Sequence, residues 1–186
     1  MPKVTRSNEI DGVVVVEPDV HADPRGTFVE PWRKEWFPGA PDMVQANRSD
    51  KVAGSLAGLH YHLRQADYWY AVVGTARVAL YDLRVGSPTE GATMLLELSG
   101  SSHRGVYIPP GVAHGFAAHT DFVLWYMVDR YYDPSDELGV AWDDPDLGID
   151  WGIGEPVLSE RDQKNPRRAE IASDRIPAIG RRADLP

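Results

Sequence analysis

Short apolar or alternating runs of strand length recur along most of the chain, and Gly, Pro, Asn or Asp residues separate them. The runs are rich in Val, Tyr and Trp, which favour β-strands. Several short strands at this spacing are typical of an all-β sandwich or barrel. We predict strands at Val13–Val16, Thr27–Val29, Leu56–His62, Tyr68–Val73, Ala76–Leu83, Met94–Leu98, Val106–Ile108 and Phe122–Val128.

Signals for turns and helices are few. The segment Val73–Thr75, with Gly74 at its centre, predicts a tight connection between two neighbouring strands. Only Trp32–Trp36 indicates a helical turn in the first half, and residues 133–154 indicate a structured loop. Because short strands with so little helix need a closed architecture to remove exposed edges, we expect a barrel. The mouth of such a barrel can gather polar side chains around a ligand.

The chain becomes polar and basic from Asp162 onward. We expect residues 166–186 to form a C-terminal helix or tail on the surface. The arginines of this region are Arg167, Arg168, Arg175, Arg181 and Arg182.

Length and charge limit the possible classes of function. A chain of 186 residues predicts one domain, residues 1–186. Its formal net charge of −9 argues against a nucleic acid or an anionic membrane as partner, because both require clustered cations. The absence of cysteine excludes disulfides and thiolate chemistry. No apolar run approaches the roughly 20 residues that span a bilayer, and the first ten residues do not resemble a signal peptide, so we expect a cytoplasmic location.

Histidine provides the first candidate chemistry, since it can act as base, acid or metal ligand near neutral pH. His60 and His62 lie two residues apart and therefore point to one face of a predicted strand. His114 lies at the entry to another apolar stretch, so a site shared by the three is expected. The remaining histidines are expected at the surface: His21, His103 and His119.

Eight short sequence blocks, in a fixed order along the chain, indicate a known family. They are residues 23–30 (DPRGTFVE), 45–49 (QANRS), 58–60 (GLH), 86–89 (GSPT), 108–116 (IPPGVAHGF), 142–145 (WDDP), 148–151 (GIDW) and 158–162 (LSERD). With these blocks the chain resembles the sugar-nucleotide epimerases of the dTDP-4-dehydrorhamnose 3,5-epimerase type, from about residue 12 to about residue 165. The resemblance implies a cupin-like jelly-roll barrel, usually a homodimer, in a pathway of carbohydrate biosynthesis.

The resemblance also implies a reaction. The substrate would be a nucleotide-diphosphate-linked 4-keto-6-deoxy-hexose, inverted at C3, C5 or both. A proton next to the ketone is removed to give an enolate, and a proton is returned to the opposite face by a second group. By resemblance, His60 is the base, Asp162 its orienting carboxylate and Tyr126 the opposing acid. No metal or organic cofactor is implied.

Further residues match binding positions of this family. Arg25 matches a diphosphate-binding arginine, whose planar fork suits that group. The others match positions near the nucleotide or substrate: Phe28, Glu30, Gln45, Asn47, His114 and Tyr131. The alternatives are a surface turn pair for Arg25 and Glu30, and interface packing for Tyr131.

Two departures from the family support alternative functions. Ala57 stands where the family has an arginine, and Asp67 stands where it has a lysine that would favour the enolate electrostatically. A second interpretation is a metal-dependent cupin enzyme, in which one divalent transition metal acts as Lewis acid in place of the lysine. Its ligands would be His60, His62, Asp67 and His114; alternatively, Asp67 only begins a strand at the surface. A third interpretation is a non-catalytic sugar-nucleotide-binding barrel, which would not need the trio of base, carboxylate and acid.

Overall fold

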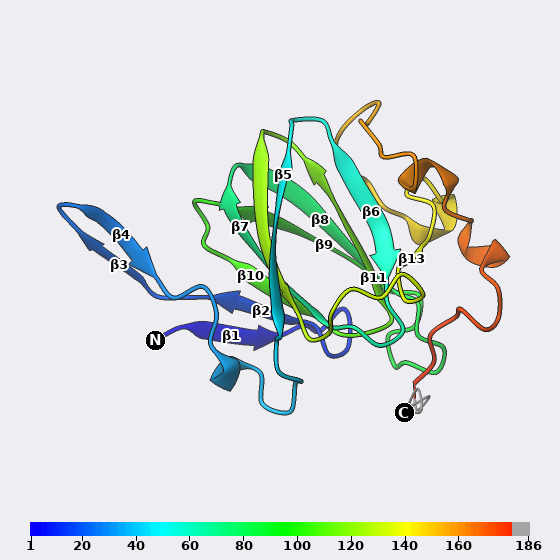
Figure 1. The fold of residues 1–186 in the computed structure, drawn as a ribbon, viewed down its shortest axis with the longest axis horizontal. Helices are drawn as coiled ribbons and strands as arrows, with labels where there is room; N and C mark the ends of the chain where they lie inside the picture. The colour runs from blue at the N-terminus through cyan, green and yellow to red at the C-terminus, as the bar shows by residue number, and fades with distance from the viewer. Residues whose placement is uncertain (180–186) are drawn as a thin grey trace.

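The computed structural model describes residues 1–179, and in it two antiparallel β-sheets pack face to face (Figure 1). The six-stranded sheet has the order β1 (Lys3–Arg6), β2 (Val14–Glu17), β10 (Gly105–Ile108), β7 (Asp67–Val73), β12 (Phe122–Val128) and β5 (Gln45–Lys51). The five-stranded sheet has the order β13 (Leu138–Gly139), β6 (Leu56–Tyr61), β11 (Val112–Ala118), β8 (Thr75–Asp82) and β9 (Thr93–Ser99). The all-β prediction is confirmed.

A two-stranded hairpin extends away from these sheets (Figure 1). It consists of β3 (Val20–Asp23) and β4 (Gly26–Val29), and nearly all of its residues are exposed. We call residues 20–29 the arm. Its residues do not contribute to the buried clusters of the described chain, so packing inside this chain does not explain the arm.

Gly74 joins strands of opposite sheets rather than two paired neighbours. β7 belongs to the six-stranded sheet and β8 to the five-stranded one, so the prediction of a connection between neighbouring strands was wrong in this respect. Gly74 has φ +77°, and a Cβ there would lie 1.9 Å from the carbonyl oxygen of Asp121. Only glycine fits this close, left-handed crossing.

The core between the sheets also forms the floor of a cavity. Trp69 from one sheet and Phe116 from the other pack edge to face, with ring centroids 5.8 Å apart, and Phe116 packs on Phe122 at 5.1 Å. Trp69 and Phe116 also line the cavity described below. The barrel is therefore packed at one end and open at the other, where polar residues replace apolar ones.

The C-terminal segment packs on the outer face of the five-stranded sheet. Ile171 joins a buried cluster with Tyr81 and Trp151, the Arg168 guanidinium lies 5.7 Å from the centroid of the Tyr81 ring, and the Tyr61 hydroxyl donates to the Arg175 carbonyl at 3.1 Å. Up to residue 179 this segment is mostly exposed and contains one short 3-10 turn, and these contacts hold it against the sheet. Arg181 and Arg182 lie outside the described residues.

The helical structure described consists of 3-10 turns. The predicted turn at Trp32–Trp36 appears as η1 (Lys34–Trp36), and the others are η2 (Pro145–Leu147), η3 (Asp162–Lys164) and η4 (Arg168–Glu170). Across residues 1–179, no helix has the length and apolar character needed to cross a membrane.

Two aspartate–arginine pairs of the same spacing, one buried and one exposed, are expected to contribute very differently to stability. Asp82 is fully buried and accepts hydrogen bonds from Arg84, Ser87 and Thr89. Burial alone would raise the pKa of Asp82, but these hydrogen bonds outweigh burial and lower it. We expect Asp82→Asn to reduce the free energy of unfolding by about 3 kcal/mol in urea titrations, because it leaves a buried charge unpaired.

The control is the exposed pair of Asp50 and Arg48, whose charged groups approach to 2.8 Å. We expect no measurable loss from Asp50→Asn, because water screens an exposed pair. Because the folded pKa of Asp82 is depressed, its contribution is present above the ordinary aspartate pKa of about 3.9 and disappears as pH falls through the folded value. Equal losses in the two variants would contradict this assignment.

Candidate active site

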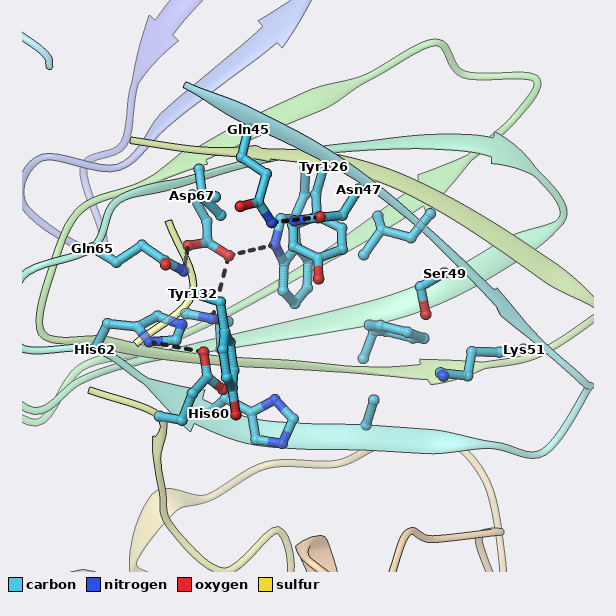
Figure 2. Close-up of a pocket in the computed structure, with 17 residues that line it drawn as sticks. Gln45, Asn47, Ser49, Lys51, His60, His62, Gln65, Asp67, Tyr126 and Tyr132 are labelled. Atoms are coloured by element: carbon cyan, nitrogen blue, oxygen red, sulfur yellow. Dashed lines mark hydrogen bonds and ion pairs between the residues drawn. The ribbon is translucent and has the colours of Figure 1, made fainter. Parts of the chain in front are cut away.

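A cavity of about 430 Å³ opens between the two sheets (Figure 2). Polar and ionisable side chains from both sheets and from two loops line it. They are Gln45, Asn47, Ser49, Lys51, His60, His62, Gln65, Asp67, His114, Tyr126, Tyr132 and Glu137.

Strand β5 contributes one wall through simple alternation. Gln45, Asn47, Ser49 and Lys51 line the cavity, whereas the intervening residues are exposed. Successive side chains on a strand point to opposite faces, so the polar sequence QANRSDK still forms a strand with one face on the cavity and one on water. The Gln45 amide donates to the Asn47 amide oxygen at 2.8 Å, which fixes both side chains.

His60 is held by a carboxylate from the C-terminal segment. Its Nε2 lies 2.6 Å from Oδ1 of Asp162, a residue of η3 that is only 4% exposed. Burial alone would raise the pKa of Asp162, but the hydrogen bond and the charge interaction with His60 outweigh burial and lower it. The ionised carboxylate accepts, so Nε2 carries the proton and Nδ1 is left with a lone pair. This pairing fixes the tautomer and stabilises the imidazolium that forms when His60 takes a proton.

Tyr126 faces the cavity from the other sheet. It lies on β12, between Asn47 of β5 and Trp69 of β7 in the strand register, whereas His60 lies on β6 of the five-stranded sheet (Figure 2). Burial raises the pKa of Tyr126, and the charges of Asp67 and Glu137 raise it further. The phenol therefore stays protonated at neutral pH and can act as a proton donor across the cavity from His60.

His62 and His114 are buried and are fixed by backbone carbonyls. Nδ1 of His62 lies 2.8 Å from the carbonyl oxygen of Asp136, and Nδ1 of His114 lies 2.9 Å from that of Val112. Burial lowers the pKa of His114 to about 4, although the charge of Asp67 opposes the shift. His114 is therefore a neutral imidazole at physiological pH.

Asp67 begins β7 but is buried, with 3% of its surface exposed. Of the two alternatives for Asp67, the one that places it at the surface is therefore wrong, although the residue does begin a strand. Gln65 Nε2 donates to its Oδ1 at 2.8 Å, and Trp69 Nε1 donates to its Oδ2 at 3.2 Å. These two hydrogen bonds hold the carboxylate in one orientation beside His114.

The structure gathers most of the predicted site residues but not all of them. His60, Tyr126, Gln45, Asn47 and His114 line the cavity, and Asp162 lies behind His60. The metal ligand set of four is reduced to three, because the ligating atoms of His62, Asp67 and His114 converge and His60 is turned to Asp162.

The arm and one tyrosine lie elsewhere. Arg25 and Phe28 are exposed on the arm and do not line the cavity of their own chain. Arg25 pairs with Asp23 at 2.6 Å, and Glu30 pairs with Arg33 at 3.3 Å, so Arg25 and Glu30 are not paired with each other. Tyr131 borders an adjacent cavity of about 400 Å³.

Several lining residues were not predicted. Ser49 and Lys51 continue the period-two pattern of Gln45 and Asn47, so alternation along β5 was the signal that could have identified them. Tyr132 lines the main cavity, whereas the predicted residue was the adjacent Tyr131. Gln65 and Glu137 come from loops that carry no periodic pattern.

Comparison with known proteins identifies the family. The sequence model of the family described as dTDP-4-dehydrorhamnose 3,5-epimerase matches residues 7–170. A dTDP-4-dehydrorhamnose 3-epimerase of Streptomyces niveus is 41% identical over 162 residues, which cover 83% of this chain and 78% of the relative. The dTDP-4-dehydrorhamnose 3,5-epimerase of Shigella flexneri is 36% identical over 162 residues, which cover 83% of this chain and 90% of the relative.

Solved structures agree with the sequence. The dTDP-6-deoxy-D-glucose-3,5-epimerase of Legionella pneumophila, in complex with dTDP-4-keto-L-rhamnose, superposes with a TM-score of 0.90 at 32% identity, covering 96% of this chain and 98% of that one. A 4-keto-6-deoxy sugar epimerase from the novobiocin gene cluster of Streptomyces spheroides gives a TM-score of 0.90 at 37% identity, covering 96% and 94%. The cupin-like jelly-roll prediction is thereby confirmed. This chain belongs to the dTDP-4-dehydrorhamnose 3,5-epimerase family, a family of isomerases that act on sugar nucleotides.

Proposed function

We propose that the protein epimerises a dTDP-linked 4-keto-6-deoxy-hexose at C3, C5 or both, through an enolate. The observation that carries this proposal is the pair of His60 and Asp162 at 2.6 Å on one wall of the cavity, with Tyr126 on the other sheet. A base and an acid on opposite walls can address opposite faces of a sugar ring between them. The named relatives are epimerases of this substrate class, which favours turnover over a non-catalytic binding barrel.

The proposed steps use groups of the chain itself. Nδ1 of His60 removes the proton next to the ketone, and Asp162 stabilises the imidazolium that results. The electron pair moves into the enolate, and the Tyr126 hydroxyl returns a proton from the opposite face. These steps require no organic cofactor.

Deuterium exchange tests the function directly. We expect the protein, incubated in D2O with dTDP-4-keto-6-deoxy-D-glucose, to incorporate solvent deuterium at C3, C5 or both, as resolved by NMR. Exchange at C3 alone would indicate a monoepimerase, matching the name of the Streptomyces niveus relative. The absence of exchange at either carbon would contradict the proposed function for this substrate.

Lys51 is proposed to bind the diphosphate of the substrate. It is the only lysine or arginine that lines the cavity in the described part of the chain, and Ala57 lies beside the same space. Lys51 stands at the end of the cavity away from Asp67, so a negatively charged group would meet the cation there and avoid the carboxylate (Figure 2).

We expect Lys51→Met to raise KM for the nucleotide sugar about tenfold with little change in kcat. A charge-assisted hydrogen bond to a part of the substrate that does not react strengthens ground state and transition state alike. Steady-state kinetics of the variant measure this separation. The control is Lys3→Met on the exposed β1, and a large loss of kcat with unchanged KM in Lys51→Met would place the lysine at the reacting carbons instead.

We also propose a homodimer in the cytoplasm. The arm of one chain exposes Phe28 and Arg25, which supports an arrangement in which the arm packs against a second copy near its cavity. A sedimentation experiment that gave the monomer mass would contradict the dimer. A cytoplasmic location is supported by the substrate class, since a charged diphosphate does not cross a bilayer unaided.

A further inference from the structure

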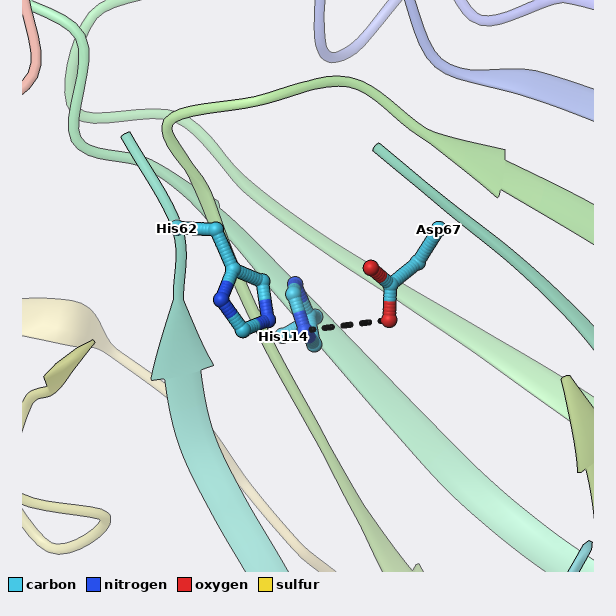
Figure 3. A group of neighbouring side chains, drawn as sticks. All are labelled: His62, Asp67 and His114. Atoms are coloured by element: carbon cyan, nitrogen blue, oxygen red, sulfur yellow. Dashed lines mark ion pairs between the residues drawn. The ribbon is translucent and has the colours of Figure 1, made fainter. Parts of the chain in front are cut away.

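Three buried side chains that line the cavity bring possible ligand atoms close together (Figure 3). His62, Asp67 and His114 are 5%, 3% and 4% exposed, and one possible ligand atom from each lies within 4.8 Å of the other two. Nε2 of His114 lies 3.8 Å from Oδ2 of Asp67, too far for a hydrogen bond. The three side chains therefore face one another without pairing.

The backbone sets which ring nitrogen of each histidine faces the cluster. A carbonyl oxygen only accepts, so the Nδ1 atoms of His62 and His114, each beside a carbonyl, carry the hydrogens. With Nδ1 as the donor in each ring, Nε2 is the nitrogen left to act as a ligand atom. Nδ1–H bonded to a backbone carbonyl is the arrangement found behind metal-binding histidines, because it fixes the tautomer and the ring orientation.

The orientation of the Asp67 side chain is likewise fixed by hydrogen bonds. The amide of Gln65 and the indole of Trp69 donate to its two oxygens at 2.8 and 3.2 Å. No residue between 1 and 179 donates a hydrogen bond to either Nε2. Two lone pairs and a carboxylate thus converge on one point, and a water molecule there could donate to only two of the three.

We propose that His62 Nε2, Asp67 Oδ2 and His114 Nε2 bind one divalent transition-metal ion. Two imidazoles and one carboxylate suit iron, zinc, nickel, cobalt or manganese, and all three residues line the cavity. His60 takes no part, because its Nε2 is committed to Asp162. The ion's role in the reaction, stabilising the negative charge of the enolate, rests on the proposed function; the binding itself does not.

The test is metal binding by the full-length, tag-free protein purified without chelators. We expect elemental analysis to find close to one transition-metal ion per chain. After chelation and dialysis, we expect Co²⁺ titration to give saturable visible absorption bands at one equivalent. His62→Gln and Asp67→Asn keep the side-chain size and should each weaken Co²⁺ binding more than about 100-fold, since even outer partners of a metal site change affinity 10–100-fold.

Controls separate the site from a surface ion and from misfolding. His119→Gln removes an exposed histidine outside the cavity and should bind Co²⁺ like the unmodified protein. Circular dichroism should show that each variant keeps its fold, and Co²⁺ should raise Tm only where His62 and Asp67 are intact. A metal-free purified protein that shows no saturable Co²⁺ binding would overturn the proposal, as would equal affinity in His62→Gln and the unmodified protein.

The metal site and the proposed function fail in different ways. His60→Ala should keep Co²⁺ affinity while losing deuterium exchange. If the unmodified protein binds metal but shows no deuterium exchange, the proposed function is contradicted and the metal site stands. If metal-free protein exchanges deuterium at the full rate, the ion has no catalytic role and the proposed epimerase function stands.

Discussion

Replacing His60 with alanine is expected to reduce deuterium incorporation into the keto-sugar by about 10²–10⁴-fold, the usual contribution of a positioned general base. The proton next to the ketone is only weakly acidic, and Nδ1 of His60 is the group that Asp162 prepares to receive it. The rate of exchange in D2O, followed by NMR at saturating substrate, measures this step without requiring inversion.

Two further measurements distinguish a lost base from a damaged fold. Added imidazole should restore part of the exchange in His60→Ala, because the small base can occupy the space that the side chain leaves. Asp162→Asn should also lose exchange, because the amide cannot stabilise the imidazolium. The matched control is His119→Ala on the surface, where exchange should be unchanged. Full exchange in His60→Ala would disprove the assigned base.

Tyr126→Phe is expected to slow inversion by about 10²-fold or more while slowing exchange much less. Removing the proton requires only the base, whereas inversion requires a donor on the other face, and the phenol hydroxyl is the group proposed there. The ratio of deuterium exchange to product formation, taken from one NMR time course, reports the difference. Phenylalanine keeps the ring that packs beside Trp69 and removes only the hydroxyl.

The raised pKa of Tyr126 adds a dependence on pH. Because burial holds this pKa above the usual tyrosine value of about 10, inversion should persist at alkaline pH up to at least that value instead of declining below it. Equal losses of exchange and inversion in Tyr126→Phe would show that the hydroxyl does not act as the opposing acid.

Apolar patterns located β6, β7, β8 and β12, but the predicted strands did not include β11, which is buried along its whole length, or the polar strand β5. The predicted strand Phe122–Val128 coincides with β12, because a strand buried in the sheet must be apolar along most of its length. Strand β5 was not predicted, since one face meets water and the other meets a polar cavity, so no apolar residues mark either face. A hydrophobic pattern therefore misses a cavity strand that is polar on both faces, whereas it located β6, β7 and β12, which also line the cavity.

Some residues of the site could likewise be predicted from the sequence and others could not. The contact between His60 and Asp162 joins residues 102 positions apart, and only the resemblance to a family linked them before the fold was known. Arg25 was assigned to the same site by that resemblance, yet in a single chain it lies on the arm. Local spacing could suggest that His60 and His62 share a face. It could not show that His60 pairs with Asp162 while His62 lies beside Asp67 and His114.

Asp162 reaches His60 from η3, a short turn in a segment that packs on the outside of the five-stranded sheet. The ladders of the two sheets do not include this segment, which is attached by separate backbone hydrogen bonds, among them Ala141 N–H to the Pro166 carbonyl and Val85 N–H to the Pro177 carbonyl. The sheets can therefore remain intact while this segment detaches. Local opening of this kind costs less free energy than global unfolding. Substitutions at Ile171, far from the substrate, would then alter the fraction of molecules whose base is correctly oriented, so that the rate of the reaction would depend on the local stability of a surface segment.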